Sequence, residues 1–176
     1  MAGQHVVVLP THYLRPDSIG WAARATRPNE TLAALDSAIE RALNARGFSA
    51  NWAFPPALAR SARRNAGYVA DPYALAGERL RPLAHVVDNS LHEPLATQIR
   101  GIIAFNDARF AVFPVELRFE SAANDRARPV LRVALLDGRT STVRWAGDIR
   151  GASGTALDTA MLDSLASSFA DLVAAP

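Results

Sequence analysis

The sequence predicts an α/β fold: a single domain over residues 1–176, three-layer-like or two-layer, with helices packed on a mixed sheet of about five strands. Three observations predict this fold. Residues 5–54 alternate strand and helix patterns, which gives two N-terminal β-α units. Residues 110–149 then follow a period of two, which is typical of a three-strand antiparallel meander. The last residues return to a helical period and predict a C-terminal helix.

The first β-α unit begins with a short apolar strand. Residues 5–9, HVVVL, form an unbroken apolar run, which favours a strand covered on both faces, and we expect residues 1–4 to be a flexible start. Pro10 then ends the strand. Residues 11–29 contain two more prolines and a glycine without a sustained period, so they predict a long loop with room for a short helical turn.

A helix and a second strand follow. Apolar residues recur at spacings of three and four over residues 30–46, which predicts a helix capped by Asn29 and closed by Gly47. Alternation in FSANWAF, residues 48–54, predicts a strand. A short helix is then expected from Pro56 to Asn65, since proline is favoured in a first helical turn.

Two more helical segments are predicted before the meander. Asp71 followed by Pro72 has the form of an N-cap and a first helical position, so residues 71–80 predict a helical segment. Residues 93–105 predict another helix, because their large apolar side chains fall on one helical face. Those side chains are Leu95, Ile99, Ile102 and Ile103.

The first meander strand is RFAVFPVELRFE. Its odd-numbered residues from Ala111 to Phe119 are apolar and are expected to share one face of the sheet. The charged residues Glu116, Arg118 and Glu120 are expected on the other face, in cross-strand ion pairs. Pro114 has no N–H to donate, which predicts a bulge or an unpaired edge at that point.

The other two meander strands flank a hairpin turn. Asp137-Gly138 is a strong hairpin signal between PVLRVALLD and STVRWAGDI. Trp145 lies in phase with Val143 and Ile149, so it is expected to face the core beneath the C-terminal helix. That helix is predicted from the spacing of Leu157, Met161, Leu165, Phe169 and Leu172.

The composition excludes several chemistries. The chain has no cysteine, which excludes disulfides, thiol nucleophiles and cysteine-ligated metals. All 19 basic residues are arginine, so no lysine is present for a Schiff base or a phosphate-binding loop. A net charge of +2 argues against a dedicated nucleic-acid binder. No apolar run approaches the about 18 residues of a membrane span, and peripheral membrane association stays open.

No catalytic, cofactor-binding or metal-binding set emerges from the spacing of the polar residues. The segment HVVDNSLHE carries His85, Asp88, His92 and Glu93, but their spacing fits no standard zinc pattern and favours a solvated loop. No GxSxG motif surrounds any serine. We therefore predict no cofactor and no catalytic residue, and we expect the chain to be a non-enzyme.

The candidate contact residues are arginines and aromatic side chains. Arg60, Arg63 and Arg64 are spaced by three and four, which gives one cationic ridge on a helix. Three interpretations remain open: a solvated face, a protein-docking ridge and nucleic-acid binding. Docking is considered because arginine and aromatic residues are enriched at protein interfaces, and the small net charge argues against nucleic acid. The full candidate set is Arg60, Arg63, Arg64, Tyr68, Tyr13, Arg15 and Trp21. The last three lie in the long loop, which either packs on its own sheet or contacts a partner.

The order of these segments resembles the small α/β domain of the TolB amino-terminal type and related domains of curli-secretion-like envelope lipoproteins. The similarity is carried by VVVLP, ALNARGF, ARFAVFPVEL and LRVALLDGRTSTVRWAGDIRG, over residues 5–9, 32–54 and 93–173. In the last motif, Asp137, Trp145 and Gly147 occupy the family's positions. The chain departs from the family in having no lipid-accepting cysteine and no β-propeller.

The resemblance implies a non-catalytic, periplasmic or outer-membrane-associated protein that contacts other envelope or membrane-complex subunits. The N-terminal residues lack the pattern of a secretory signal, so we expect either a cytoplasmic protein or removal of a leader. The alternative function is a small-molecule or anion-binding domain, or a weak hydrolase. It would use a cleft near Asp17 and Asp107 at the carboxyl ends of the strands.

Overall fold

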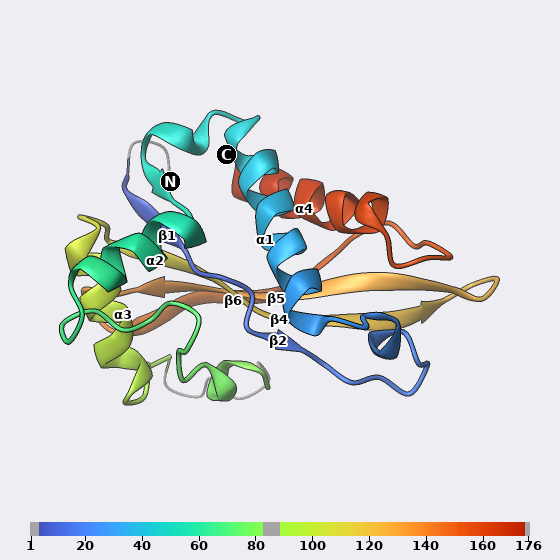
Figure 1. The fold of residues 1–176 in the computed structure, drawn as a ribbon, viewed down its shortest axis with the longest axis horizontal. Coiled ribbons are helices and arrows are strands. Elements are labelled where there is room, and N and C mark those ends of the chain that lie inside the picture. The colour runs from blue at the N-terminus through green and yellow to red at the C-terminus, as the bar shows by residue number, and fades with distance from the viewer. Residues whose placement is uncertain (1–3, 83–88, 175–176) are drawn as a thin grey trace.

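The computed structural model describes residues 4–82 and 89–174, and it shows a mixed sheet with helices on both faces (Figure 1). The strands are β1 (Val6–Val8), β2 (Tyr13–Leu14), β3 (Trp52–Ala53), β4 (Phe110–Ala122), β5 (Arg126–Asp137) and β6 (Thr142–Arg150). The helices are α1 (Pro28–Asn44), α2 (Pro55–Arg64), α3 (Leu95–Phe105) and α4 (Thr159–Ala174). Short 3-10 turns lie at η1 (Ala22–Arg24), η2 (Phe48–Ala50) and η3 (Glu78–Leu80). The predicted α/β class is confirmed.

Within the described residues, the sheet has six strands in the order β3-β1-β4-β5-β6, with β2 also paired to β4. β1 is parallel to both β3 and β4, and the meander β4-β5-β6 is antiparallel. The prediction of about five strands therefore missed β2, which lies inside the segment 11–29 that was expected to be a loop.

Helices cover both faces of the sheet, which gives three layers. α1 and α4 pack together on one face, where they bury Leu35, Ile39 and Phe169. α2 and α3 cover the other face through residues such as Leu58 and Ile99. Figure 1 shows α1 beside α4 on one side of the strands, with α3 on the other. All three residues of β1 are buried, as the apolar run predicted.

Three local predictions are wrong. α1 begins at Pro28 after Arg27, without a side-chain cap, so Asn29 lies inside the first turn instead of capping the helix. Residues 48–54 form mainly the η2 turn, and only Trp52–Ala53 pairs as a strand. Residues 71–80 form turns, because the Asp71 carboxylate accepts the N–H of Tyr73 and no α-helix follows. Gly47 does follow α1 in a left-handed conformation, with φ of 86°.

A β-bulge in β4 changes which face its side chains occupy. The register with β5 shifts between Pro114 and Glu116, which confirms the bulge predicted at this proline. Phe113 and the unpaired Val115 face α2 and α3, whereas Leu117 beyond the shift faces α1 and α4. The expectation that all odd-numbered residues share one face is therefore wrong, since one extra residue reverses the alternation.

A second bulge lies in β6, and it separates Val143 from Trp145, which were expected to share one face. Leu135 pairs with Trp145 and Leu136 pairs with Val143, so Arg144 is the extra residue in β6. Val143 then packs with the α2-α3 core, while Trp145 lines a groove on the α4 side. Trp145 thus lies on the predicted side of the sheet. The prediction that it is a core residue is wrong, since it is 41% exposed on β6, the last strand of the described sheet order.

Candidate binding surface and pockets

The predicted arginine ridge is exposed on α2. Leu58 and Ala62 bury one side of this helix, which turns Arg60, Arg63 and Arg64 toward solvent. Within residues 4–82 and 89–174, none of the three guanidinium groups forms an ion pair. Arg63 and Arg64 lie in the last turn, where the helix dipole favours positive charge. The ridge is therefore available to an anionic partner.

Two large aromatic side chains are exposed next to this ridge. After α2, the chain turns through Gly67, whose φ of 91° favours glycine, and Val69 anchors the turn in the core. Between them, Tyr68 is 80% exposed. Its carbonyl oxygen lies against Gly101 of α3, and Phe105, 47% exposed, comes one helical turn later on that face.

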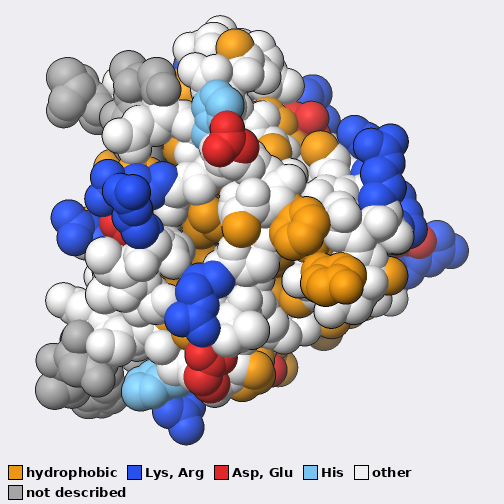
Figure 2. Space-filling view, turned by 90° about the vertical axis from the view of Figure 1, so that its left-hand side faces the viewer, with side chains coloured by type: hydrophobic (Ala, Val, Ile, Leu, Met, Phe, Trp, Pro, Cys, Tyr) orange, Lys and Arg blue, Asp and Glu red, His pale blue; other side chains and the backbone are white. Residues whose placement is uncertain are grey.

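We call Arg60, Arg63, Arg64, Tyr68 and Phe105 the aromatic-arginine surface. Figure 2 shows exposed hydrophobic side chains on this end of the molecule, with basic side chains to either side of them. The sequence prediction named four of these five residues and missed Phe105. Phe105 could have been identified from the sequence, because it is a large apolar residue outside the buried stripe of α3.

The other three predicted contact residues lie elsewhere. Trp21 is 4% exposed and packs its ring 6.0 Å from that of Phe119, so it is part of the core and not a contact residue. Tyr13 lies on β2 and Arg15 comes directly after this strand. Both residues are next to the buried Glu116 of β4. Here the structure supports self-packing of the long loop.

Glu116 is the centre of a charged cluster at β2. Its Oε2 atom accepts the Nε–H of Arg81 at 2.6 Å, and its Oε1 atom lies 3.8 Å from Nη1 of Arg15. The Arg81 guanidinium also covers the ring of Tyr13, at 4.8 Å from the ring centroid. Burial and a hydrogen bond with Glu78 raise the pKa of Tyr13 to about 12. These contacts hold the loop on the sheet.

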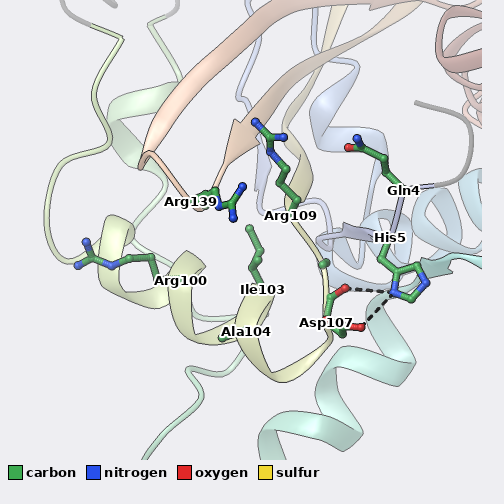
Figure 3. Close-up of a pocket in the computed structure, with 10 residues that line it drawn as sticks. Gln4, His5, Arg100, Ile103, Ala104, Asp107, Arg109 and Arg139 are labelled. Atoms are coloured by element: carbon green, nitrogen blue, oxygen red, sulfur yellow. Dashed lines mark hydrogen bonds and ion pairs between the residues drawn. The ribbon is translucent and has the colours of Figure 1, made fainter.

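A pocket of about 700 Å³ opens where β1 and β4 begin and where the β5-β6 turn lies. Arg100, Arg109 and Arg139 contribute to its lining. Figure 3 shows Arg109 and Arg139 on one side of the pocket, and His5 beside Asp107 on the other. The His5 ring lies 3.1 Å from the Asp107 carbonyl oxygen and 3.7 Å from its carboxylate.

The fully buried Asp137 fixes two sides of this pocket. Its Oδ2 atom accepts a hydrogen bond from Nη2 of Arg109 at 3.1 Å. Its Oδ1 atom accepts a hydrogen bond from the backbone N–H of Arg139 at 3.0 Å. Burial opposes ionisation, but these hydrogen bonds from Arg109, Arg139 and Thr140 hold the pKa of Asp137 below its ordinary value. Arg100 is held separately by Glu93, at 3.0 Å. Within the described residues, Arg139 is therefore the one of these three arginines that forms no ion pair.

The structure does not bring Asp17 and Asp107 together. Asp107 precedes β4, whereas Asp17 follows β2, which pairs with β4 near Leu117, about 20 Å further along the strand. The Asp17 carboxylate accepts the N–H groups of Trp21 and Ala22 at 2.9 and 2.7 Å. The cleft proposed for a ligand or a weak hydrolase at these two residues is therefore wrong.

The described residues hold neither a metal site nor a membrane-spanning helix. His85 and Asp88 of the segment HVVDNSLHE lie outside the described residues, as do residues 1–3 of the expected flexible start. Among the residues that are described, no group of three or more His, Asp or Glu is placed to hold a metal ion. No helix in residues 4–82 and 89–174 is both long and apolar enough to cross a bilayer.

Comparison with known proteins finds similarity only to solved structures. No protein-family model matches the chain, and no curated protein matches its sequence. The LpoB C-terminal domain from Salmonella enterica is 13% identical, with 89% of this chain and 85% of that chain covered and a TM-score of 0.42. A PelC dodecamer from Paraburkholderia phytofirmans is 12% identical, with coverages of 94% and 84% and a TM-score of 0.42. The LpoB C-terminal domain from Escherichia coli is 16% identical, with coverages of 85% and 83% and a TM-score of 0.39.

Proposed function

We propose that this chain is a non-catalytic protein-interaction domain of the cell envelope, which docks on an acidic partner protein through the aromatic-arginine surface. The finer proposal is an accessory subunit on the periplasmic side of a larger membrane complex. The sequence resemblance to the TolB amino-terminal type supports the location. The observation that carries the docking function is the exposure of Tyr68 and Phe105 beside the three arginines of α2.

The physical argument starts from the cost of exposing these rings. Tyrosine and phenylalanine side chains bury large apolar areas when covered, and interfaces derive most of their binding energy from a few such anchors. Tyr68 is largely exposed to water and Phe105 about half exposed, although the core holds other aromatic residues such as Phe113 and Phe169. A partner that covers the two rings would recover this hydrophobic free energy.

The charges around the rings indicate the kind of partner. Arg60, Arg63 and Arg64 lie on α2, which contacts α3, and Arg139 lines the pocket beside α3 without an ion pair among the described residues. A surface of one sign steers a partner of the opposite sign and selects against like-charged proteins. We therefore expect acidic residues around an apolar contact on the partner.

The test is co-purification with variants of the surface. The tagged chain is isolated from gently solubilised membranes, first as wild type and then as the double variant Tyr68→Ala, Phe105→Ala and the triple variant Arg60→Ser, Arg63→Ser, Arg64→Ser. Loss of either set is expected to weaken recovery of the partner about tenfold or more, with the melting temperature unchanged since all five side chains are exposed.

A charge-matched control separates docking from a general effect of basic charge. The variant Arg79→Ser, Arg128→Ser, Arg144→Ser removes three other exposed arginines and is expected to leave recovery unchanged. Recovery of the wild-type chain alone from the cytosolic fraction would refute the envelope location. A partner retained equally by all variants would refute the docking surface.

A further inference from the structure

The parallel part of the sheet creates a crevice at the carboxyl end of β1. β1 lies between β3 and β4. The chain reaches β3 through α1 on one face and reaches β4 through α2 and α3 on the other. In open parallel sheets, connections that leave to opposite faces separate outside the strand's carboxyl end, and ligands bind in that gap.

A cavity of about 280 Å³ lies at this position. Three segments that are distant in sequence form its walls: the residues directly after β1, the first half of α1, and the turn region after α2. The polar side chains among them are Thr11, His12, Asn29, Asp36 and Tyr73. Small-molecule sites combine a concave surface with a few convergent polar groups of this kind.

Asp36 presents one bound and one free carboxylate oxygen. Its Oδ1 atom accepts the backbone N–H of Thr11 at 2.8 Å and the Thr11 hydroxyl at 2.7 Å. In the described part of the chain, no hydrogen bond reaches Oδ2. Burial raises the pKa of Asp36 to about 6, although both hydrogen bonds from Thr11 favour the ionised form. The carboxyl is thus rigidly held and lacks a compensating cation among the described residues.

His12 positions the wall that carries Tyr73, because both of its ring nitrogens contact backbone groups. Its Nδ1 atom lies 2.9 Å from the carbonyl oxygen of Pro10, and its Nε2 atom accepts the N–H of Leu75 at 3.2 Å. Both ring nitrogens are used when the ring is neutral with its proton on Nδ1. Burial lowers the pKa of His12, in agreement with that state.

The charges that act on the cavity are mainly negative. Asp36, Asp71 and Glu40 act on Tyr73, with Arg63 as the opposing cation, and burial together with the carboxylates raises the pKa of Tyr73. The remaining acid, Glu78 beside His12, already interacts with Tyr13 and Arg81. The exposed Tyr73 ring offers a face that attracts cations.

We infer that this crevice binds a small organic cation, a primary ammonium or guanidinium group, through the free Oδ2 atom of Asp36 with the Tyr73 ring as one wall. A cation at this position supplies the positive charge that the buried carboxylate lacks. Binding therefore favours ionised Asp36, so affinity is expected to rise with pH from about 5 to about 7.5. Arg63 of the aromatic-arginine surface acts on Tyr73, but no residue of that surface lines the cavity, so the test does not depend on that proposal.

The test uses three four-carbon probes that differ in charge: putrescine, 1,4-butanediol and succinate. Amide resonances of Thr11 and Asn29 are followed by NMR at about pH 7.5 and about pH 5. Putrescine is expected to shift both resonances with a dissociation constant that is lower at the higher pH, while butanediol and succinate leave them unchanged. Addition of putrescine is also expected to lower the pKa of the Asp36 carboxyl group, measured from the chemical shift of its carboxyl carbon.

Two variants and a control complete the test. Asp36→Asn and, separately, Tyr73→Ala are expected to weaken putrescine binding about tenfold or more. Asp125→Asn removes the same charge in the β4-β5 turn, where a φ of 53° suits asparagine equally well, and is expected to bind as wild type does. Equal binding of butanediol, binding of succinate, no response to any probe, or full affinity in Asp36→Asn would each overturn the inference.

Discussion

Replacing Asp36 by asparagine isolates the free-energy cost of an ionised carboxyl in the β1 crevice. Asparagine keeps the Oδ1 atom that accepts two hydrogen bonds from Thr11, so the local geometry is preserved. Because burial raises the pKa of Asp36 from 3.8 to about 6, the folded state binds more protons than the unfolded state between those pH values. The contribution of Asp36 to stability is therefore fully present below about pH 4 and is lost as the pH rises through 6.

The difference between the two pKa values sets the size of the effect. It corresponds to a free-energy cost of about 3 kcal/mol at neutral pH, which the uncharged asparagine avoids. The variant Asp36→Asn is expected to be about 2–3 kcal/mol more stable than wild type at pH 7.5 and nearly equal to it below pH 4.

Urea unfolding at a series of pH values measures this difference. His12 contributes in the opposite sense, because burial lowers its pKa and its stabilising neutral form is lost as the pH falls below 6.5. That contribution is present in both proteins, so it cancels in the difference between them. A difference that does not change with pH, or a variant less stable than wild type at pH 7.5, would refute the assignment of a desolvated, uncompensated carboxyl.

Two other expectations concern the outer part of the sheet. Burial opposes ionisation of Asp148, but bidentate hydrogen bonds from Arg118 and Arg132 hold its pKa well below the ordinary value. The Asp148 carboxylate therefore stabilises the folded state above about pH 4, and this stabilisation is lost on acidification. Asp148→Asn is expected to lower the free energy of unfolding at pH 7 by about 1–2 kcal/mol, after allowance for solvent contact, and an unchanged urea midpoint would contradict this. Acrylamide is expected to quench Trp145, 41% exposed, far more than Trp21 or Trp52, 4% and 7% exposed, and uniform quenching among single-tryptophan variants would contradict the register of β6.

Elements governed by local periodicity could be predicted from the sequence. The apolar run of β1, the stripes of α1, α3 and α4, and the Asp137-Gly138 hairpin all formed as expected. Each stripe is repeated several times within one element, so it does not depend on distant contacts. The exposure of Arg60, Arg63 and Arg64 also followed from a single helix period.

Features set by distant contacts or by one extra residue could not be predicted. The segment 71–80 has a plausible helix start, but His12 binds the N–H of Leu75 from 63 residues away and fixes a turn instead. One inserted residue in β4 reversed the face assigned to Leu117, and one in β6 put Val143 on the opposite face from Trp145. Asp36 reads as an ordinary polar residue of a helix, and only its contact with Thr11 reveals the crevice.

The crevice lies where the pairing of β4 with its parallel neighbours is interrupted. β1 pairs with β4 up to Val112, and β2 pairs with it again from Glu116, so the interruption coincides with Pro114 and the bulge. Proline has no N–H to donate there, and the neighbouring chain leaves the ladder as the segment from Pro10 to His12. Its freed backbone groups need other partners: the Thr11 N–H is bound by Asp36, and the Pro10 carbonyl by the His12 ring. The side chains that bind these unpaired backbone groups, Asp36 and His12, also line the cavity. The strand irregularity and the candidate binding site therefore occur together in this fold.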